Sequence, residues 1–131
     1  ELYAIHYHLA VYKKSTGKMI HNQTGYWLWC AQSGTVMNSF AIPRGVGVIA
    51  GGEYGKDSGA EGIVSLEVSA SLGSSKWGIV QSPFMTKKAS TLGFSQKVIV
   101  NERELKYEET TLLDIYGRKF EHSDSNILIR Q

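Results

Sequence analysis

The chain has 131 residues, of which 42% are hydrophobic, 11% aromatic and 20% charged, with only two prolines. This composition is typical of one globular domain and excludes a disordered, collagen-like or disulfide-rich chain. The formal net charge is +2, and no basic run is longer than two residues, so nucleic acid is not an expected partner.

Membrane association is not expected either, because no apolar run approaches the roughly 20 residues that cross a bilayer and no signal segment opens the chain. Cys30 is the single cysteine, which excludes an intrachain disulfide and fits a cytoplasmic protein. The chain begins at Glu1 directly in a strand pattern, so we expect that an N-terminal segment is missing. A monomer and a homodimer both fit the sequence.

Apolar and polar residues alternate in short runs along nearly the whole chain, and no window has the spacing of an amphipathic helix. Strands are predicted at residues 3–12, 25–30, 35–42, 64–71, 77–80, 92–100, 105–115 and 120–129. Residues 46–50 form a further short segment of small residues. Gly51 to Gly62 contains five glycines and is predicted as an exposed, mobile loop.

The predicted fold is all-β, with residues 1–131 forming one domain. About eight strands that return by short turns describe an antiparallel meander, and closing it into a β-barrel hides both edge strands. The one helical turn is expected near Pro83 to Ser90, where the alternation is interrupted. A barrel of this size has an interior, which side chains or one small ligand can fill.

Four segments carry a family resemblance: His21–Trp29, Ala41–Gly52, Ser82–Phe84 and Leu105–Leu128. In order and spacing they resemble the fatty-acid-binding-protein-like haem-binding β-barrels. This lipocalin-like family includes nitrobindin and the C-terminal domain of a THAP-type zinc-finger protein, and the likeness is greatest to its bacterial branch. The resemblance covers almost the whole chain.

The resemblance implies a ten-stranded barrel that holds haem b non-covalently through one histidine near the C-terminus. Nitric oxide binding and peroxynitrite isomerisation are attributed to the nitrobindins of this family. Two features depart from the family pattern. The usual first strand with Gly-x-Trp-x-Gly is absent, so about eight of ten strands are expected, in a barrel that need not be closed. The stretch that leads to the last histidine also differs from that of nitrobindins.

His122 is the predicted iron ligand, because the resemblance places the proximal histidine here and a neutral imidazole binds haem iron well. Asp124 faces the same side by alternation and could accept the second ring N–H of His122. The resemblance also places His21 beside the distal face of the haem. The alternatives are a solvated histidine near the terminus for His122 and a turn histidine bonded to the backbone for His21.

Three further residues complete the predicted site. Ile20 and Ile42 align with pocket positions of the family, and Arg44 could neutralise a haem propionate at the barrel mouth. A solvated turn arginine is the alternative for Arg44. The porphyrin walls, or equally a plain apolar core, would be drawn from Trp27, Trp29, Met37, Phe40, Ile42 and Phe94.

The first functional hypothesis is therefore a haem b-binding barrel that binds nitric oxide or isomerises peroxynitrite, and whether it is an enzyme stays open. The second is a carrier of another apolar small molecule in the same cavity. The third is a structural barrel that binds a partner protein. Cys30 lacks the Cys-x-x-Cys-His context of covalent c-type haem.

Overall fold

The computed structural model describes residues 1–54 and 62–131. Residues 55–61, which make up most of the predicted Gly51–Gly62 loop, lie outside the described residues. Within the described part of the chain the structure is almost entirely strand, which confirms the predicted all-β class.

The described residues contain nine strands, whereas about eight were predicted from the sequence. They are β1 (Leu2–Tyr12), β2 (Met19–Cys30), β3 (Thr35–Ile42), β4 (Val46–Glu53), β5 (Val64–Leu72), β6 (Gly78–Gln81), β7 (Ala89–Val100), β8 (Glu104–Ile115) and β9 (Arg118–Ile129). They form a single sheet in the order β1-β2-β3-β4-β6-β5-β7-β8-β9.

The sheet departs from a simple antiparallel meander at β6. This four-residue strand lies between β4 and β5 and pairs parallel to the end of β5, at Ser71 with Gly78 and Leu72 with Ile79. The strands β4 and β5 pair directly only at Gly51 with Ser69, because they diverge from there toward the Val46 end of β4, which pairs with β6 instead. β6 fills the gap that the divergence opens.

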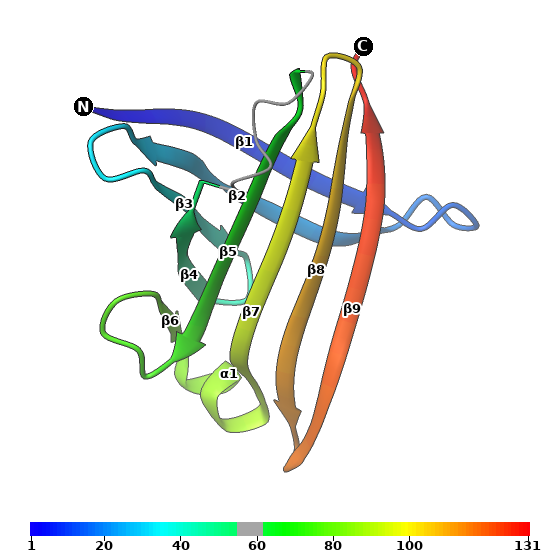
Figure 1. The fold of residues 1–131 in the computed structure, drawn as a ribbon. Helices are drawn as coiled ribbons and strands as arrows, with labels where there is room; N and C mark the ends of the chain where they lie inside the picture. The colour runs from blue at the N-terminus through cyan, green and yellow to red at the C-terminus, as the bar shows by residue number, and fades with distance from the viewer. Residues whose placement is uncertain (55–61) are drawn as a thin grey trace.

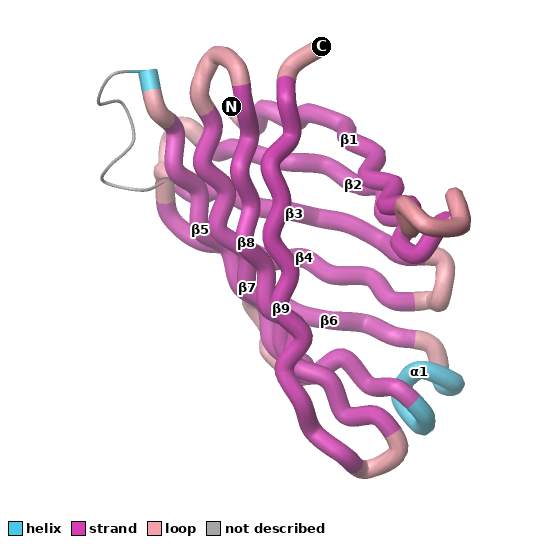
Figure 2. The backbone as a smooth tube through the Cα atoms, turned by 90° about the vertical axis from the view of Figure 1, so that its right-hand side faces the viewer, coloured by secondary structure: helices cyan, strands magenta, loops and turns pink. Residues whose placement is uncertain are grey.

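The sheet curls so that its two ends face each other. In Figure 1, β1 and β2 cross behind β5, β7, β8 and β9 at a steep angle, and Figure 2 shows the curl from the side. Among the described residues β1 pairs only with β2 and β9 only with β8, so both outer edges are free. The fold is a half-barrel with a concave inner face and a convex outer face.

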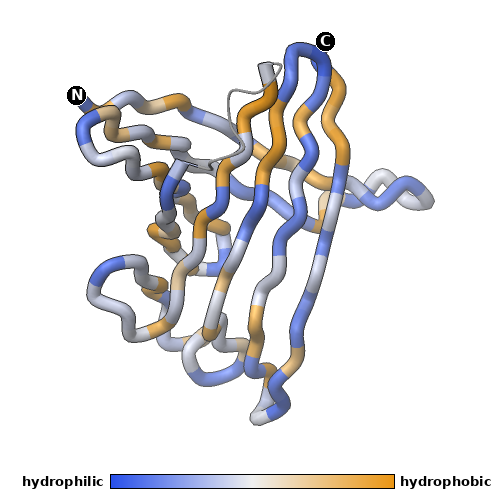
Figure 3. Tube along the Cα trace, viewed as in Figure 1, coloured by the Kyte–Doolittle hydropathy of each residue, from blue (hydrophilic) through white to orange (hydrophobic). Residues whose placement is uncertain are grey.

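The apolar core lies on the inner face, between the two crossing halves of the sheet. Phe40 of β3 and Phe94 of β7 meet there edge to face, with ring centroids 5.0 Å apart. Each fully buried side chain of this kind contributes about 1.5 to 3 kcal/mol to folding. Figure 3 shows the alternation of apolar and polar residues along the strands that produces this one-sided core. The buried cluster comprises Val36, Phe40, Val46, Val48, Ala50, Val68, Ala70, Ile79, Met85 and Phe94.

Two glycines of the predicted loop belong instead to strand β4, so the loop prediction is wrong for residues 51–53. A Cβ atom on Gly51 would overlap the indole ring of Trp77, and one on Gly52 would overlap the carbonyl oxygen of Glu67. Glycine is required here for close approach of strands and ring, a role that composition alone does not separate from loop flexibility.

The helix α1 (Pro83–Lys88) confirms the helical turn predicted near residues 83–90. Ser82 caps it, because its hydroxyl accepts a hydrogen bond from the Met85 backbone N–H at 3.3 Å, and Pro83 occupies the first turn. Met85 is buried in the core, which ties α1 to the sheet. In residues 1–54 and 62–131, no helix has the length and hydropathy to span a membrane.

Candidate functional site

Both predicted site histidines lie on the inner face of the sheet. Directly paired residues of neighbouring antiparallel strands point to the same side. His122 of β9 pairs with Thr111, which pairs with the buried Phe94. His21 of β2 is two residues from Gln23, whose side chain is only 3% exposed on the inner side. The crossing of the two halves thus brings residues that are 101 positions apart to one concave surface.

Six polar side chains of the inner face form a continuous hydrogen-bonded series, which we call the polar chain. Its members, in order, are His21, Gln23, Tyr7, Asn38, Gln96 and Glu109. The five hydrogen bonds between successive members measure 3.0, 2.6, 2.9, 3.0 and 3.2 Å, and they cross the sheet from β2 through β1, β3 and β7 to β8.

The middle of the polar chain is fully buried. Asn38 is 0% exposed and Gln96 8% exposed, yet each has its side-chain partners. In residues 1–54 and 62–131 no buried side-chain nitrogen or oxygen lacks a hydrogen bond. A satisfied buried network is rigid, because breaking any one bond leaves a polar group in a low-dielectric interior. The polar chain therefore fixes the geometry between the two halves.

Glu109 is the charged end of the polar chain. Burial raises the pKa of its carboxyl above the ordinary value, and the charge of Asp124 adds to the rise. His21 and His122 both act in the opposite direction on this pKa, as does the hydrogen bond from Gln96. Both site histidines therefore lie within electrostatic range of one half-buried carboxylate.

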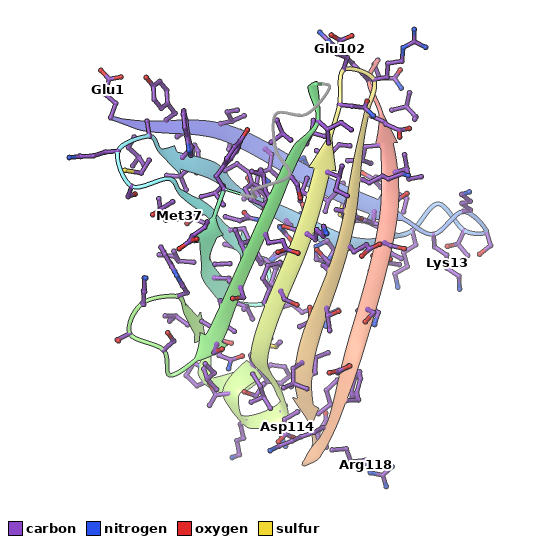
Figure 4. The ribbon with its side chains drawn as sticks, in the orientation of Figure 1. Glu1, Lys13, Met37, Glu102, Asp114 and Arg118 are labelled. Atoms are coloured by element: carbon purple, nitrogen blue, oxygen red, sulfur yellow. The ribbon has the colours of Figure 1, made fainter. Side chains whose placement is uncertain are left out.

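His122 is the more accessible of the two histidines. All residues of β9 are exposed, since the strand has a neighbour on one edge only. Among the described residues the His122 imidazole makes no hydrogen bond, so both ring nitrogens are available to a ligand. The expected bond to Asp124 is absent among the described residues, and that carboxylate accepts from the Ser125 backbone N–H at 2.9 Å. Asp114 lies at the far end of β8, next to the turn at Arg118 (Figure 4).

The other three predicted site residues are not brought together. Ile42 is half-buried against the core cluster, close to the start of β4. Ile20 is the extra residue where the pairing passes from Val11–His21 to Tyr12–Met19, and it is 58% exposed. Arg44 is exposed in the turn between β3 and β4, where its carbonyl oxygen accepts a hydrogen bond from the Ser82 hydroxyl.

The proposed porphyrin walls divide between the two faces. Met37 alternates with the buried Val36 and Asn38 and so lies on the outer face; Figure 4 marks its place on β3. Trp29 pairs with the buried Val36 and so lies on the inner face, where it stacks on Tyr3 at 5.7 Å near the free edge of the sheet and is 43% exposed. Four further members also lie on the inner face, as partly or fully buried core: Trp27, Phe40, Ile42 and Phe94.

The residues present fit an axially ligated haem in their donor chemistry. A porphyrin iron needs one strong donor with a free lone pair and apolar surface around it. The unengaged His122 imidazole supplies the donor on the concave side. Phe120, two residues earlier on the same face of β9, is 43% exposed and offers apolar surface.

The grooves of the described residues lie elsewhere. One, of about 720 Å³, is open and is lined on the outer face by polar side chains that include Glu67, Lys97 and Glu108. A smaller one runs between β8 and β9 beside Glu109 and Asp124. Neither His21 nor His122 lines these two grooves.

Most of the polar chain was missed from the sequence, although a signal for it exists. Asn38 interrupts the apolar period between Val36 and Phe40, and Gln96 does the same in β7. A single amide on the buried face of an otherwise apolar strand needs partners, because an unpaired buried amide costs about 1 to 3 kcal/mol. Two such amides on different strands predict a contact between them.

A family model described as "THAP4-like, heme-binding beta-barrel domain" matches residues 2–130. The crystal structure of Rv2717c from M. tuberculosis is similar, with a TM-score of 0.70 and 21% sequence identity, over 99% of this chain and 79% of that chain. At this identity the likeness shows a shared fold. No curated protein matches the chain.

Proposed function

Because the chain belongs to the family of THAP4-like haem-binding β-barrel domains, we propose that it binds haem b non-covalently with His122 as the axial iron ligand. The observation that carries the proposal is the His122 imidazole itself, which lies on the inner face without any hydrogen bond among the described residues. His122 is exposed on this face, so its ring nitrogens can reach a ligand without breaking an existing hydrogen bond.

When bound, haem would supply an iron centre that can take a small ligand such as nitric oxide or peroxynitrite on the face away from the histidine. The chain's own residues determine what surrounds that ligand. His21 is the candidate on the ligand side, and its ring is held by Gln23 at 3.0 Å. Arg44 is an exposed cation without an ion pair among the described residues, which suits it to a propionate.

A carrier of a long apolar molecule is the second candidate, and the polar chain disfavours it. An apolar tail that filled the interior would have to displace the bonds of Asn38 and Gln96, which are buried and fully satisfied. Each amide left without a partner would cost about 1 to 3 kcal/mol. A flat ligand held at the edge of the concave face leaves these bonds in place.

The test is a hemin titration followed by absorbance, with the wild type and three variants. His122→Ala should keep the fold, lose the histidine-ligated spectrum and bind hemin roughly 10- to 100-fold more weakly. His21→Ala should keep that spectrum and change only the affinity or rates for nitric oxide. His8→Ala is the matched control, because His8 is an exposed histidine of β1 that bonds Asn22.

Two results would contradict the proposal. If His21→Ala alone removed the histidine-ligated spectrum, the assignment of the two sides would be reversed. If no single histidine variant changed the spectrum, hemin would be adsorbed without a defined ligand and the proposal of His122 would fail.

A further inference from the structure

The hydrogen bonds of the polar chain all run from donor to acceptor toward Glu109, and Glu109 sets this order. A carboxylate only accepts hydrogen bonds, so Gln96 must present its Nε2 group to Glu109 Oε2, at 3.2 Å. This leaves Gln96 Oε1 as an acceptor, and Asn38 donates to it from Nδ2 at 3.0 Å. The orientation of both buried amides therefore follows from the charge at one end.

The same constraint passes through the remaining links. Since Nδ2 of Asn38 is used, its Oδ1 accepts from the Tyr7 hydroxyl at 2.9 Å. The phenol has one proton and has donated it, so Tyr7 must accept from Gln23 Nε2, at 2.6 Å. Gln23 then has only its Oε1 to offer to His21, whose Nε2 lies 3.0 Å away. An acceptor at this distance requires a proton on Nε2.

We propose that Glu109 is a positioning residue that fixes the tautomer of His21, five hydrogen bonds away, as Nε2–H with a lone pair on Nδ1. All five donors point toward the carboxylate, and no link can reverse alone without placing two donors or two acceptors face to face. Such a clash inside a buried network leaves a polar group unsatisfied.

The tautomer decides what His21 offers to a neighbouring ligand, and this use rests on the proposed function. A neutral His21 with Nε2–H engaged presents an acceptor and no N–H. The ring therefore selects ligands that carry a hydrogen-bond donor, such as water or a hydroperoxide, over acceptor-only molecules such as nitric oxide. The structure thus assigns the ligand class that His21 favours.

The experiment measures the tautomer in haem-free protein, so it is independent of hemin binding. Two-bond proton–nitrogen correlation spectra of protein labelled with ¹⁵N-histidine are recorded at pH 8, and His21→Gln identifies the His21 signals. The wild type should show only the Nε2–H form of His21. In Glu109→Gln, the amide at this end of the polar chain can present either its oxygen or its NH₂ group to Gln96. The NH₂ orientation reverses the links as far as His21, so a population with the proton on Nδ1 should appear.

Glu109→Lys gives the strongest test, because an ammonium group only donates. A donor at this end reverses every link, so that Gln23 donates to Nε2 of His21 and the Nδ1–H form should predominate. If this variant does not fold, Glu109→Gln decides. The controls are Glu108→Gln and Glu108→Lys, since Glu108 is exposed on the outer face and should leave the His21 signals unchanged.

An Nδ1–H or doubly protonated His21 in the wild type would overturn the inference, as would a pure Nε2–H form that persists in both Glu109 variants. A failed hemin titration with the expected tautomer pattern would instead reject the haem ligation and leave the role of Glu109 standing.

Discussion

The two histidines of the inner face occupy opposite kinds of environment. His21 belongs to the polar chain, whose central residue Asn38 is 0% exposed and whose members come from five strands. His122 lies on β9, all of whose residues are exposed. The first ring is held by a network that spans the molecule, and the second is free.

The difference arises from the sheet rather than from the residue type. Strands β2 and β7 have neighbours on both edges and face the opposite half of the sheet, so their inner side chains lose contact with water. Strand β9 has one neighbour, β8, and a free edge. One fold thus provides one imidazole that is held by hydrogen bonds and one that is exposed and unengaged.

The largest contrast is expected in stability. Asn38→Leu removes the acceptor of Tyr7 and the donor to Gln96 while keeping the volume, so it should lower the free energy of unfolding by about 2 to 4 kcal/mol. Ser125→Ala on β9 should change it by less than about 0.5 kcal/mol. Urea unfolding measures both. Equal losses would mean that the polar chain is no more stabilising than the edge strand.

A smaller contrast separates the histidines themselves. His21→Ala leaves the Gln23 carbonyl without its donor and should reduce the free energy of unfolding by about 1 kcal/mol. His122→Ala removes an exposed ring without hydrogen bonds, so a change below about 0.5 kcal/mol is expected in haem-free protein. Urea unfolding of both variants measures the two losses. A larger loss for His122→Ala would show that β9 is held more tightly than its exposure indicates.

The smallest effect is a dependence on pH. Burial raises the pKa of Glu109 in the folded state above its unfolded value, so its contribution to stability is greatest below the unfolded pKa and is lost as pH rises through the folded pKa. Glu109→Gln has no such titration. The stability of this variant relative to the wild type should therefore increase between pH 4 and pH 7, measured by urea unfolding at several pH values. A relative stability that decreases over this range would contradict the assigned direction.

Alternation in the sequence was sufficient to predict the strands and the class of fold. The segments 35–42 and 120–129 were predicted within two residues of β3 and β9, because each alternates cleanly and ends at a turn. The parallel pairing of β6 could not be predicted, since it depends on how far β4 and β5 diverge in space. Gly51 was misread because a glycine beneath an indole ring and a glycine in a loop look alike in sequence.

The site was only partly predictable. Alternation assigns residues to two faces but does not say which face is concave, so His21 and His122 could be named only through the family resemblance. Their common neighbour Glu109 depends on the crossing of β2 with β8, which no local pattern records. Asn38 and Gln96 carried a readable signal, as polar residues on an apolar face, but the partner of each is 58 residues away.

The two free edges of the half-barrel differ in how they resist association with other chains. Strand β9 carries Arg118, Lys119, Glu121 and Asp124, and charges on an edge strand discourage pairing with another copy. Strand β1, from Leu2 to Tyr12, has no lysine, arginine, aspartate or glutamate, and Leu2 and Ile5 are well exposed. In a concentrated solution of this domain, aggregation would begin at β1, and a lysine placed on that strand would be the first change to make for solubility.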